Sequence, residues 1–80
     1  MNEYRFIASI KILVGADKLI EKYYSHDYFK CMEFLKGTIA TFQMIKALSS
    51  DTEISYINIK EITASGEQIT TFKEQDFLNK

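Results

Sequence analysis

The stretch SHDYFKCMEFLKGTIATFQMIKAL, residues 25–48, decides which fold this chain can adopt. Its apolar side chains recur every three or four residues, which is the period of one face of an α-helix. Ser25 can cap this helix by accepting a hydrogen bond from a free backbone N–H, and Asp27 suits the positive end of the helix dipole. We therefore predict one long amphipathic helix that begins after Ser25. Its buried stripe would contain Tyr28, Cys31, Met32, Leu35, Thr38, Ile39, Phe42 and Ile45.

The segment before this helix predicts a hairpin of two strands. In residues 4–14 the even-numbered positions are apolar or aromatic, whereas several odd-numbered positions are polar, which is typical of a strand with one buried face. Gly15-Ala16 fits a two-residue type II′ turn, because that turn favours glycine in its first position. Residues 17–24 would then form the returning strand. The predicted pairs are Val14 with Asp17, Ile12 with Leu19, Ile10 with Glu21, and Ala8 with Tyr23.

The segment after the helix predicts a second hairpin. Residues 53–62 are rich in the β-branched and aromatic side chains that strands favour. Turn-forming residues at 63–66 lead to a returning strand at 67–73. The tail, residues 74–80, carries two apolar side chains in a polar setting, and we expect it to add a final helical turn or to dock on a neighbour.

These elements predict an α+β fold, in which an antiparallel sheet of about four strands (β-β-α-β-β) carries one long amphipathic helix on one face. The alternative order is β-α-α-β-β, with residues 16–24 as a short helix, because residues 17–22 also tolerate a helical period. The chain has 80 residues, no proline, no internal repeat and no low-complexity tract. We therefore expect a single domain over residues 1–80.

The composition excludes several classes of protein. A chain that is 46% hydrophobic and 14% aromatic is too apolar to be disordered. Ten Lys and Arg residues against eleven Asp and Glu residues argue against a protein that coats nucleic acid through bulk charge. The first apolar run is interrupted by Ser9 and Lys11 and falls short of the roughly 20 apolar residues of a membrane span. With one cysteine and no predicted signal peptide or membrane span, we expect a cytoplasmic protein.

The sequence predicts no enzyme, no cofactor and no metal site. His26 and Cys31 are the only histidine and cysteine, and their spacing of five residues points the two side chains in different directions on a helix. The carboxylates are scattered, and no glycine-rich loop could hold a phosphate. The alternative, an enzyme or small-ligand site, would need a pocket between the first hairpin and the helix, lined by Glu21, Tyr23, Tyr28 and Cys31.

The outward face of the predicted sheet is the first candidate binding surface. It gathers five cations, and we expect no acid among them. Interleaved with apolar and aromatic side chains, they suit docking on an acidic protein or stacking on single-stranded nucleic acid. A solvated face whose lysines discourage aggregation is the alternative. The candidate residues are Arg5, Lys11, Lys18, Ile20, Lys22, Tyr24, Tyr56 and Lys60; the third strand would present Ile54, Tyr56, Asn58, Lys60 and Ile62 outward.

The back of the helix is the second candidate surface. Gly37, Ala40, Met44 and Ala47 share the side opposite the buried stripe. A glycine inside a helix costs about 1 kcal/mol relative to alanine, and close approach of a second helix would explain its use. Two copies could pack this strip about a two-fold axis, and the sheet face or its edge is the alternative surface for self-association.

We therefore predict a small, non-enzymatic, intracellular binding module. It would act as a regulator or inhibitor through protein–protein interaction, as a homodimer. The alternative function is nucleic-acid binding through the basic and aromatic sheet face.

Overall fold

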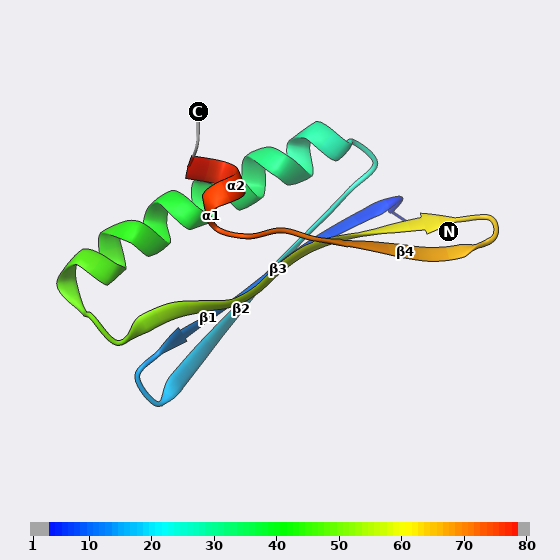
Figure 1. The fold of residues 1–80 in the computed structure, drawn as a ribbon. Helices are drawn as coiled ribbons and strands as arrows, with labels where there is room; N and C mark the ends of the chain where they lie inside the picture. The colour runs from blue at the N-terminus through cyan, green and yellow to red at the C-terminus, as the bar shows by residue number, and fades with distance from the viewer. Residues whose placement is uncertain (1–3, 79–80) are drawn as a thin grey trace.

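The computed structural model describes residues 4–78, which form two β-hairpins joined by a long helix. The elements are β1 (Phe6–Val14), β2 (Asp17–Ser25), α1 (Tyr28–Leu48), β3 (Thr52–Thr63), β4 (Gly66–Thr71) and α2 (Gln75–Leu78). The strands form one antiparallel sheet in the order β2-β1-β3-β4, and α1 lies across one of its faces (Figure 1). The predicted α+β fold and the order β-β-α-β-β are confirmed, and the alternative with a helix at residues 16–24 is wrong.

The first hairpin has the predicted register. Val14 pairs with Asp17, and the ladder continues to Phe6 opposite Ser25. Gly15 has a φ of 60°, whereas no residue other than glycine has a positive φ in the part of the chain that the structure describes. A positive φ in the first turn position alone is the signature of the type II′ turn. The turn and the alternation of side chains together fix which face of β2 meets the helix.

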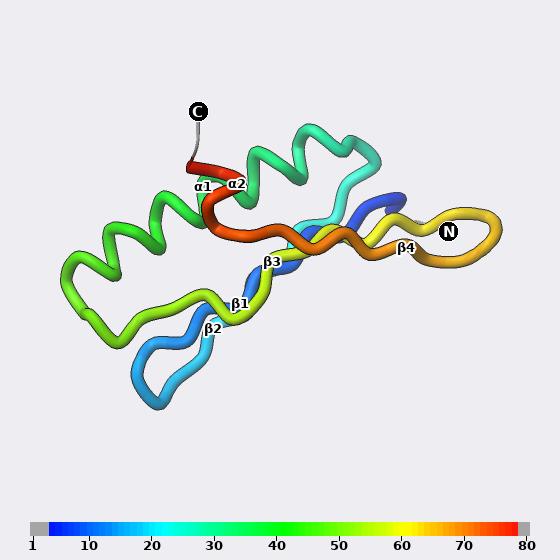
Figure 2. Tube along the Cα trace, in the orientation of Figure 1, coloured from blue at the N-terminus to red at the C-terminus, as the bar shows by residue number. Residues whose placement is uncertain are grey.

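The core lies between α1 and the two central strands. The traces of the two central strands, β1 and β3, run together through the middle of the molecule in Figure 2, and α1 lies to one side of them. Each element contributes the side chains of one face, as the helical and strand periods require. The buried apolar residues are Phe6, Ala8, Ile10 and Ile12 of β1, Cys31, Leu35, Ile39 and Phe42 of α1, Ile57 and Ile59 of β3, and Phe77 of α2.

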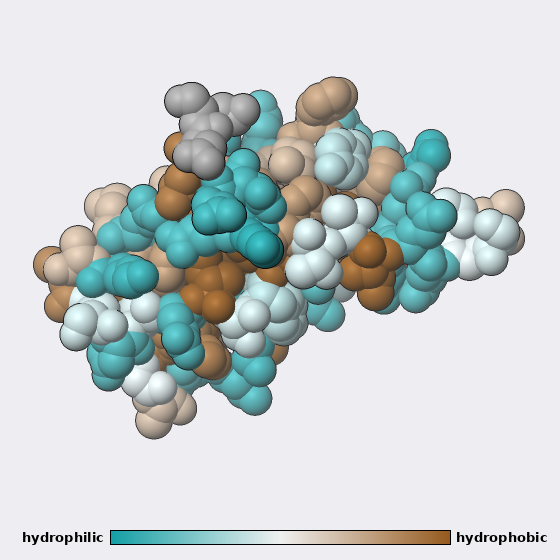
Figure 3. All heavy atoms as spheres, viewed as in Figure 1, coloured by the Kyte–Doolittle hydropathy of each residue, from teal (hydrophilic) through white to brown (hydrophobic). Residues whose placement is uncertain are grey.

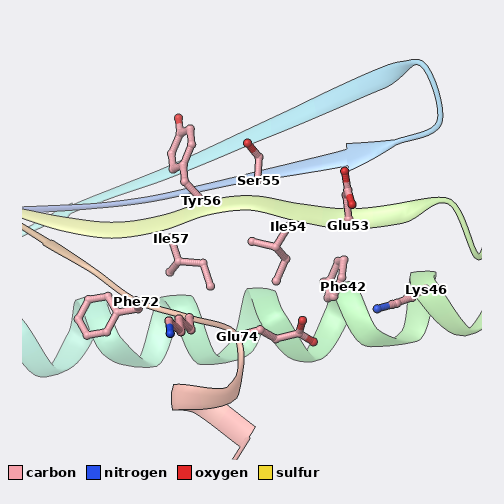
Figure 4. A pocket seen from close by; sticks show the side chains of 10 residues that line it. Phe42, Lys46, Glu53, Ile54, Ser55, Tyr56, Ile57, Phe72 and Glu74 are labelled. Carbon is pink, nitrogen blue, oxygen red and sulfur yellow. The ribbon is translucent and has the colours of Figure 1, made fainter.

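A β-bulge in β3 corrects one prediction about the outward face. Ile54 is opposite Ile12 and Tyr56 is opposite Lys11, so Ser55 is an extra residue in the ladder. Figure 4 shows Ser55 and Tyr56 pointing away from α1, whereas Ile54 points toward it. The prediction that Ile54 faces outward is therefore wrong. Ser55 and Tyr56 both point outward at the bulge, so the residues before Ser55 face the opposite side from the one that simple alternation with Tyr56 predicts.

The helix begins two residues later than predicted, because Asp27 rather than Ser25 is its N-cap. The Asp27 carboxylate accepts a hydrogen bond of 2.9 Å from the backbone N–H of Phe29. Ser25 is the last residue of β2, and its hydroxyl accepts from the backbone N–H of Asp27 at 3.0 Å. Ser25 therefore positions the capping residue instead of capping the helix.

The carboxy-terminal segment folds back onto the helix layer. β4 ends at Thr71, two residues earlier than predicted, and the chain then turns toward α1 (Figure 1). The short α2 brings Phe77 into the core, where its ring packs edge-on against Phe72 with the centroids 5.6 Å apart. The tail thus forms the expected helical turn, and it packs on its own chain. Among the described residues, no helix is long and apolar enough to cross a membrane.

Candidate functional site

The sheet face opposite α1, here called the open face, is the main candidate site. Within residues 4–78 no other element packs on it. It exposes three large apolar side chains: Ile20 is 46% exposed, Tyr24 48% and Ile69 61%. Strand pairing arranges the open face in rows that cross the sheet. The rows are Lys18, Leu13 and Glu53; Ile20, Lys11 and Tyr56; Lys22, Ser9, Asn58 and Thr71; and Tyr24, Ile7, Lys60 and Ile69.

Three lysines surround Ile20 on the open face. Lys18 and Lys22 lie two positions before and after Ile20 on β2, and Lys11 is directly opposite it on β1. Side chains at these positions are close neighbours on one face of a sheet. No acidic group of residues 4–78 lies within ion-pair distance of any of the three. Lys11, Lys18 and Lys22, here called the lysine triad, therefore make the β1 and β2 side of the open face positive.

The other two cations predicted for this face are paired with acids. The Arg5 guanidinium lies 2.9 Å from the Glu61 carboxylate, and the Lys60 ammonium lies 3.7 Å from that of Glu67. The expectation that no acid accompanies the five cations is therefore wrong. Both acids come from the second hairpin, and their positions depend on how β3 pairs with β1 and β4. Exposed ion pairs of this kind contribute little to stability. Glu67 lies on the open face and reduces its positive potential beside Lys60, whereas Glu61 is opposite the core residue Phe6 and draws the Arg5 side chain toward the α1 side of the sheet.

An aromatic group extends the open face beyond the end of β1. The ring of Tyr4 lies 5.8 Å from that of Tyr24 and 5.2 Å from that of His26. The alternation of the sequence placed Tyr4 with the core residues, but β1 begins at Phe6, and Tyr4 is 42% exposed. Tyr4 and Ile69 are thus two candidate contact residues that the sequence pattern did not indicate. Exposed aromatic side chains are enriched at protein interfaces.

The four residues of the alternative catalytic pocket are not brought together. Glu21 lines a pocket of about 220 Å³ whose other walls come from the helix and neighbouring strand residues. Tyr23 instead stacks on Phe34, with the ring centroids 5.2 Å apart, and Tyr28 packs edge-on against Phe6 at 5.5 Å. The other residues that line this pocket are Ile12, Leu19, Thr38, Thr41, Phe42 and Ile45, and none of them belongs to the predicted set.

The single thiol, Cys31, is buried in the core. Its side chain is fully inaccessible, and burial raises the pKa of the Cys31 thiol. A hydrogen bond with the backbone of Ala8 opposes this rise in pKa, and the charge of Asp27 adds to it. The thiolate is the nucleophilic form, so these surroundings favour an unreactive thiol. Among residues 4–78 no cluster of three or more His, Cys, Asp or Glu side chains could hold a metal ion.

The strip predicted on the back of α1 is exposed. All four of its residues, Gly37, Ala40, Met44 and Ala47, face solvent. A Cβ atom built on Gly37 would meet nothing within 4 Å, so the fold of this chain does not require glycine there. Met44 is 71% exposed, and Leu48 at the end of the strip is 91% exposed.

Comparison with known proteins gives no match for this chain among protein-family models, curated proteins or solved structures.

Proposed function

We propose that this protein is a non-enzymatic binding module whose open face docks on an acidic surface of a partner protein. The observation that carries the proposal is the lysine triad around the exposed side chain of Ile20. Burial of Ile20 would contribute hydrophobic free energy, while the three ammonium groups would select an acidic rim and accelerate the encounter. An apolar centre surrounded by charged groups is the usual anatomy of a protein interface.

A protein partner suits the open face better than nucleic acid does. The positive charge is confined to the β1 and β2 side of the face, because Glu53 on β3 lies in the same row as Lys18, and Glu67 on β4 lies beside Lys60. A phosphate backbone would meet three free lysines and then acidic groups. Three phosphate contacts give weak, strongly salt-dependent binding. Nucleic acid is the second candidate, because Tyr56 lies opposite Lys11 and could stack on an exposed base.

Binding by wild type and by two charge-reversed variants tests this proposal. A pull-down from source-cell extract, followed by purification of the captured protein, gives a defined partner for titration. The Lys11→Glu/Lys22→Glu variant should bind that partner at least about tenfold more weakly, because it replaces attraction with repulsion at the centre of the surface. The control, Lys30→Glu/Lys36→Glu, makes the same change in net charge on exposed positions of α1 and should bind like wild type.

Equal binding by wild type and the Lys11→Glu/Lys22→Glu variant would contradict the proposal. The same proteins are titrated with a labelled oligothymidylate. Tight binding of this probe that is lost in the Lys11→Glu/Lys22→Glu variant, with no protein captured, would replace the protein partner by single-stranded nucleic acid.

We also propose that the module is a cytoplasmic regulator or inhibitor and that two copies pair through the helix strip. The exposed Met44 and the open space over Gly37 support pairing, since a second helix could approach closely there. Sedimentation velocity at micromolar concentration should show a dimer for wild type and for Tyr56→Glu, and a monomer for Gly37→Gln. A monomeric wild type, or a dimeric Gly37→Gln variant, would contradict pairing through this strip.

A further inference from the structure

In the part of the chain that the structure describes, one side of β3 has no neighbouring strand over its first five residues. β4 pairs with β3 only from Asn58 to Thr63. The backbone N–H of Phe72 still donates to the carbonyl of Ile57 at 2.9 Å, and the chain then turns toward α1. Residues 52–56 thus have β1 on one side and, within residues 4–78, no strand on the other. An edge of this kind presents backbone N–H and C=O groups that an added strand can pair with, here from Glu53 onward because Thr52 is only 2% exposed.

A pocket of about 330 Å³ with a mixed apolar and polar lining lies directly beside this free edge. Its apolar walls come from α1, from β3 and from the segment after β4: they are Phe42, Ile54, Ile57 and Phe72 (Figure 4). The volume is at the lower end of the range for ligand pockets and can hold a large apolar side chain. In the space-filling view, hydrophobic surface is visible between the helix layer and the sheet, surrounded by hydrophilic residues (Figure 3).

The accessible charge around this pocket is positive. Lys46 and Lys73 both line it, and the Lys46 ammonium lies 5.7 Å from the centre of the Phe42 ring. Two acids also line it. The Glu74 carboxylate accepts a hydrogen bond of 2.7 Å from the neutral amide of Gln43 and keeps its negative charge. The other, Glu53, points away from α1, on the far side of β3 (Figure 4). A ligand in the pocket would therefore meet two lysines, Lys46 and Lys73, and one acid, Glu74, which together leave a net positive charge.

We propose that an extended peptide segment of a partner protein binds at this edge as an additional strand, with an apolar side chain in the pocket and an acidic side chain on either side of it. The free backbone edge selects an extended conformation, and main-chain hydrogen bonds provide affinity. The pocket selects one apolar side chain, and Lys46 and Lys73 select the acidic neighbours. Because alternate side chains of a strand share a face, the matching pattern is acidic, any, apolar, any, acidic.

The other strand edges are less suitable for such a ligand. β2 carries charged residues at four of its nine positions, Asp17, Lys18, Glu21 and Lys22, and charges on an edge strand oppose pairing. All six residues of β4 are exposed, and Ile69, which lies on the open face, is its one apolar side chain, so β4 offers no enclosed apolar wall. The segment at residues 52–56 carries one charged side chain, which points away from the groove. This site is separate from the open face, and the proposal does not depend on the function proposed above.

A peptide of sequence TETLTET, labelled with fluorescein, tests the proposal against the folded protein. It should bind at millimolar protein concentration, and amide hydrogen exchange should slow by about tenfold at residues 53–56 and not in β2. Two matched peptides should bind at least about tenfold more weakly. One is TKTLTKT, which reverses the charges, and the other is TETLTET with alternate backbone nitrogens methylated, which keeps the side chains and removes the hydrogen-bond donors.

Two protein variants separate this edge from the open face. Lys73 is exposed, so Lys73→Glu should leave the fold intact and weaken TETLTET binding by about tenfold. Lys22→Glu, on the open face, should bind the peptide like wild type. Equal binding of the methylated and unmethylated peptides, protection that maps to β2, or no binding of TETLTET would each overturn the proposal. None of these outcomes affects the test of the open face, which uses a different partner and different variants.

Discussion

The Phe42→Ala variant is expected to lose most of the stability of the domain. Phe42 is 1% exposed and forms part of two pocket walls, one beside β2 and one beside the free edge of β3. Removing its ring leaves a cavity where α1 meets the sheet, and such substitutions cost about 3–5 kcal/mol. A domain of this size has only a few kcal/mol of net stability, so the variant should be largely unfolded at 37 °C. Urea denaturation followed by circular dichroism measures the loss.

Met44→Ala is the matched control for Phe42→Ala. Met44 lies two residues further along α1 but is 71% exposed, so its truncation removes few contacts. The expected change in the free energy of unfolding is within about 0.5 kcal/mol, as is usual for surface positions. Similar losses in the two variants would show that Phe42 does not anchor α1 on the sheet.

The Ala8→Leu variant is expected to lift the first half of α1 away from the sheet. Ala8 is fully buried, with Tyr23 and Ile59 as its neighbours across the two adjacent strands. Ala8 and Cys31 are both fully buried in the core between β1 and α1, and their small side chains let the two elements approach closely. Three additional heavy atoms have no space there, and overpacking of this kind costs about 1–3 kcal/mol.

The reactivity of the thiol reports this displacement separately from the stability. In wild type the buried Cys31 should react with an aromatic disulfide reagent only slowly, whereas in Ala8→Leu the reaction should be faster under conditions where the protein remains folded. Ala64→Leu enlarges an exposed turn residue and should change neither the unfolding free energy nor the thiol reactivity. Unchanged reactivity and stability in Ala8→Leu would contradict the close approach of α1 at this position.

The parts of the fold that depend on neighbouring residues could be predicted from the sequence. The first hairpin follows from strict alternation and a glycine that permits the turn, and its register places Lys11, Lys18 and Lys22 on the face opposite α1. The long helix follows from its apolar stripe, of which Cys31, Leu35, Ile39 and Phe42 are buried as predicted. Local spacing is sufficient in both cases, because each pattern has the period of a single element.

The features that were missed depend on contacts between distant segments. The bulge at Ser55 fits β3 against β1, and nothing in the local sequence indicates an extra residue there. The ion pair of Arg5 with Glu61 exists because β3 lies beside β1. The end of β4 at Thr71 and the docking of Phe77 likewise depend on the position of α1. These features decide how much of the open face is positive and where the free edge of β3 begins.

The position of β1 in the sheet has a consequence for the folding kinetics. On one side β1 pairs with β2, to which a two-residue turn connects it. On the other side β1 pairs with β3, and this pairing places Phe6 opposite Glu61. Each hairpin closes a short loop and can form within microseconds, whereas the β1–β3 ladder must close a loop that contains the whole of α1. The rate-limiting barrier is therefore expected at the meeting of the two hairpins, where the most remote contacts of the chain form together.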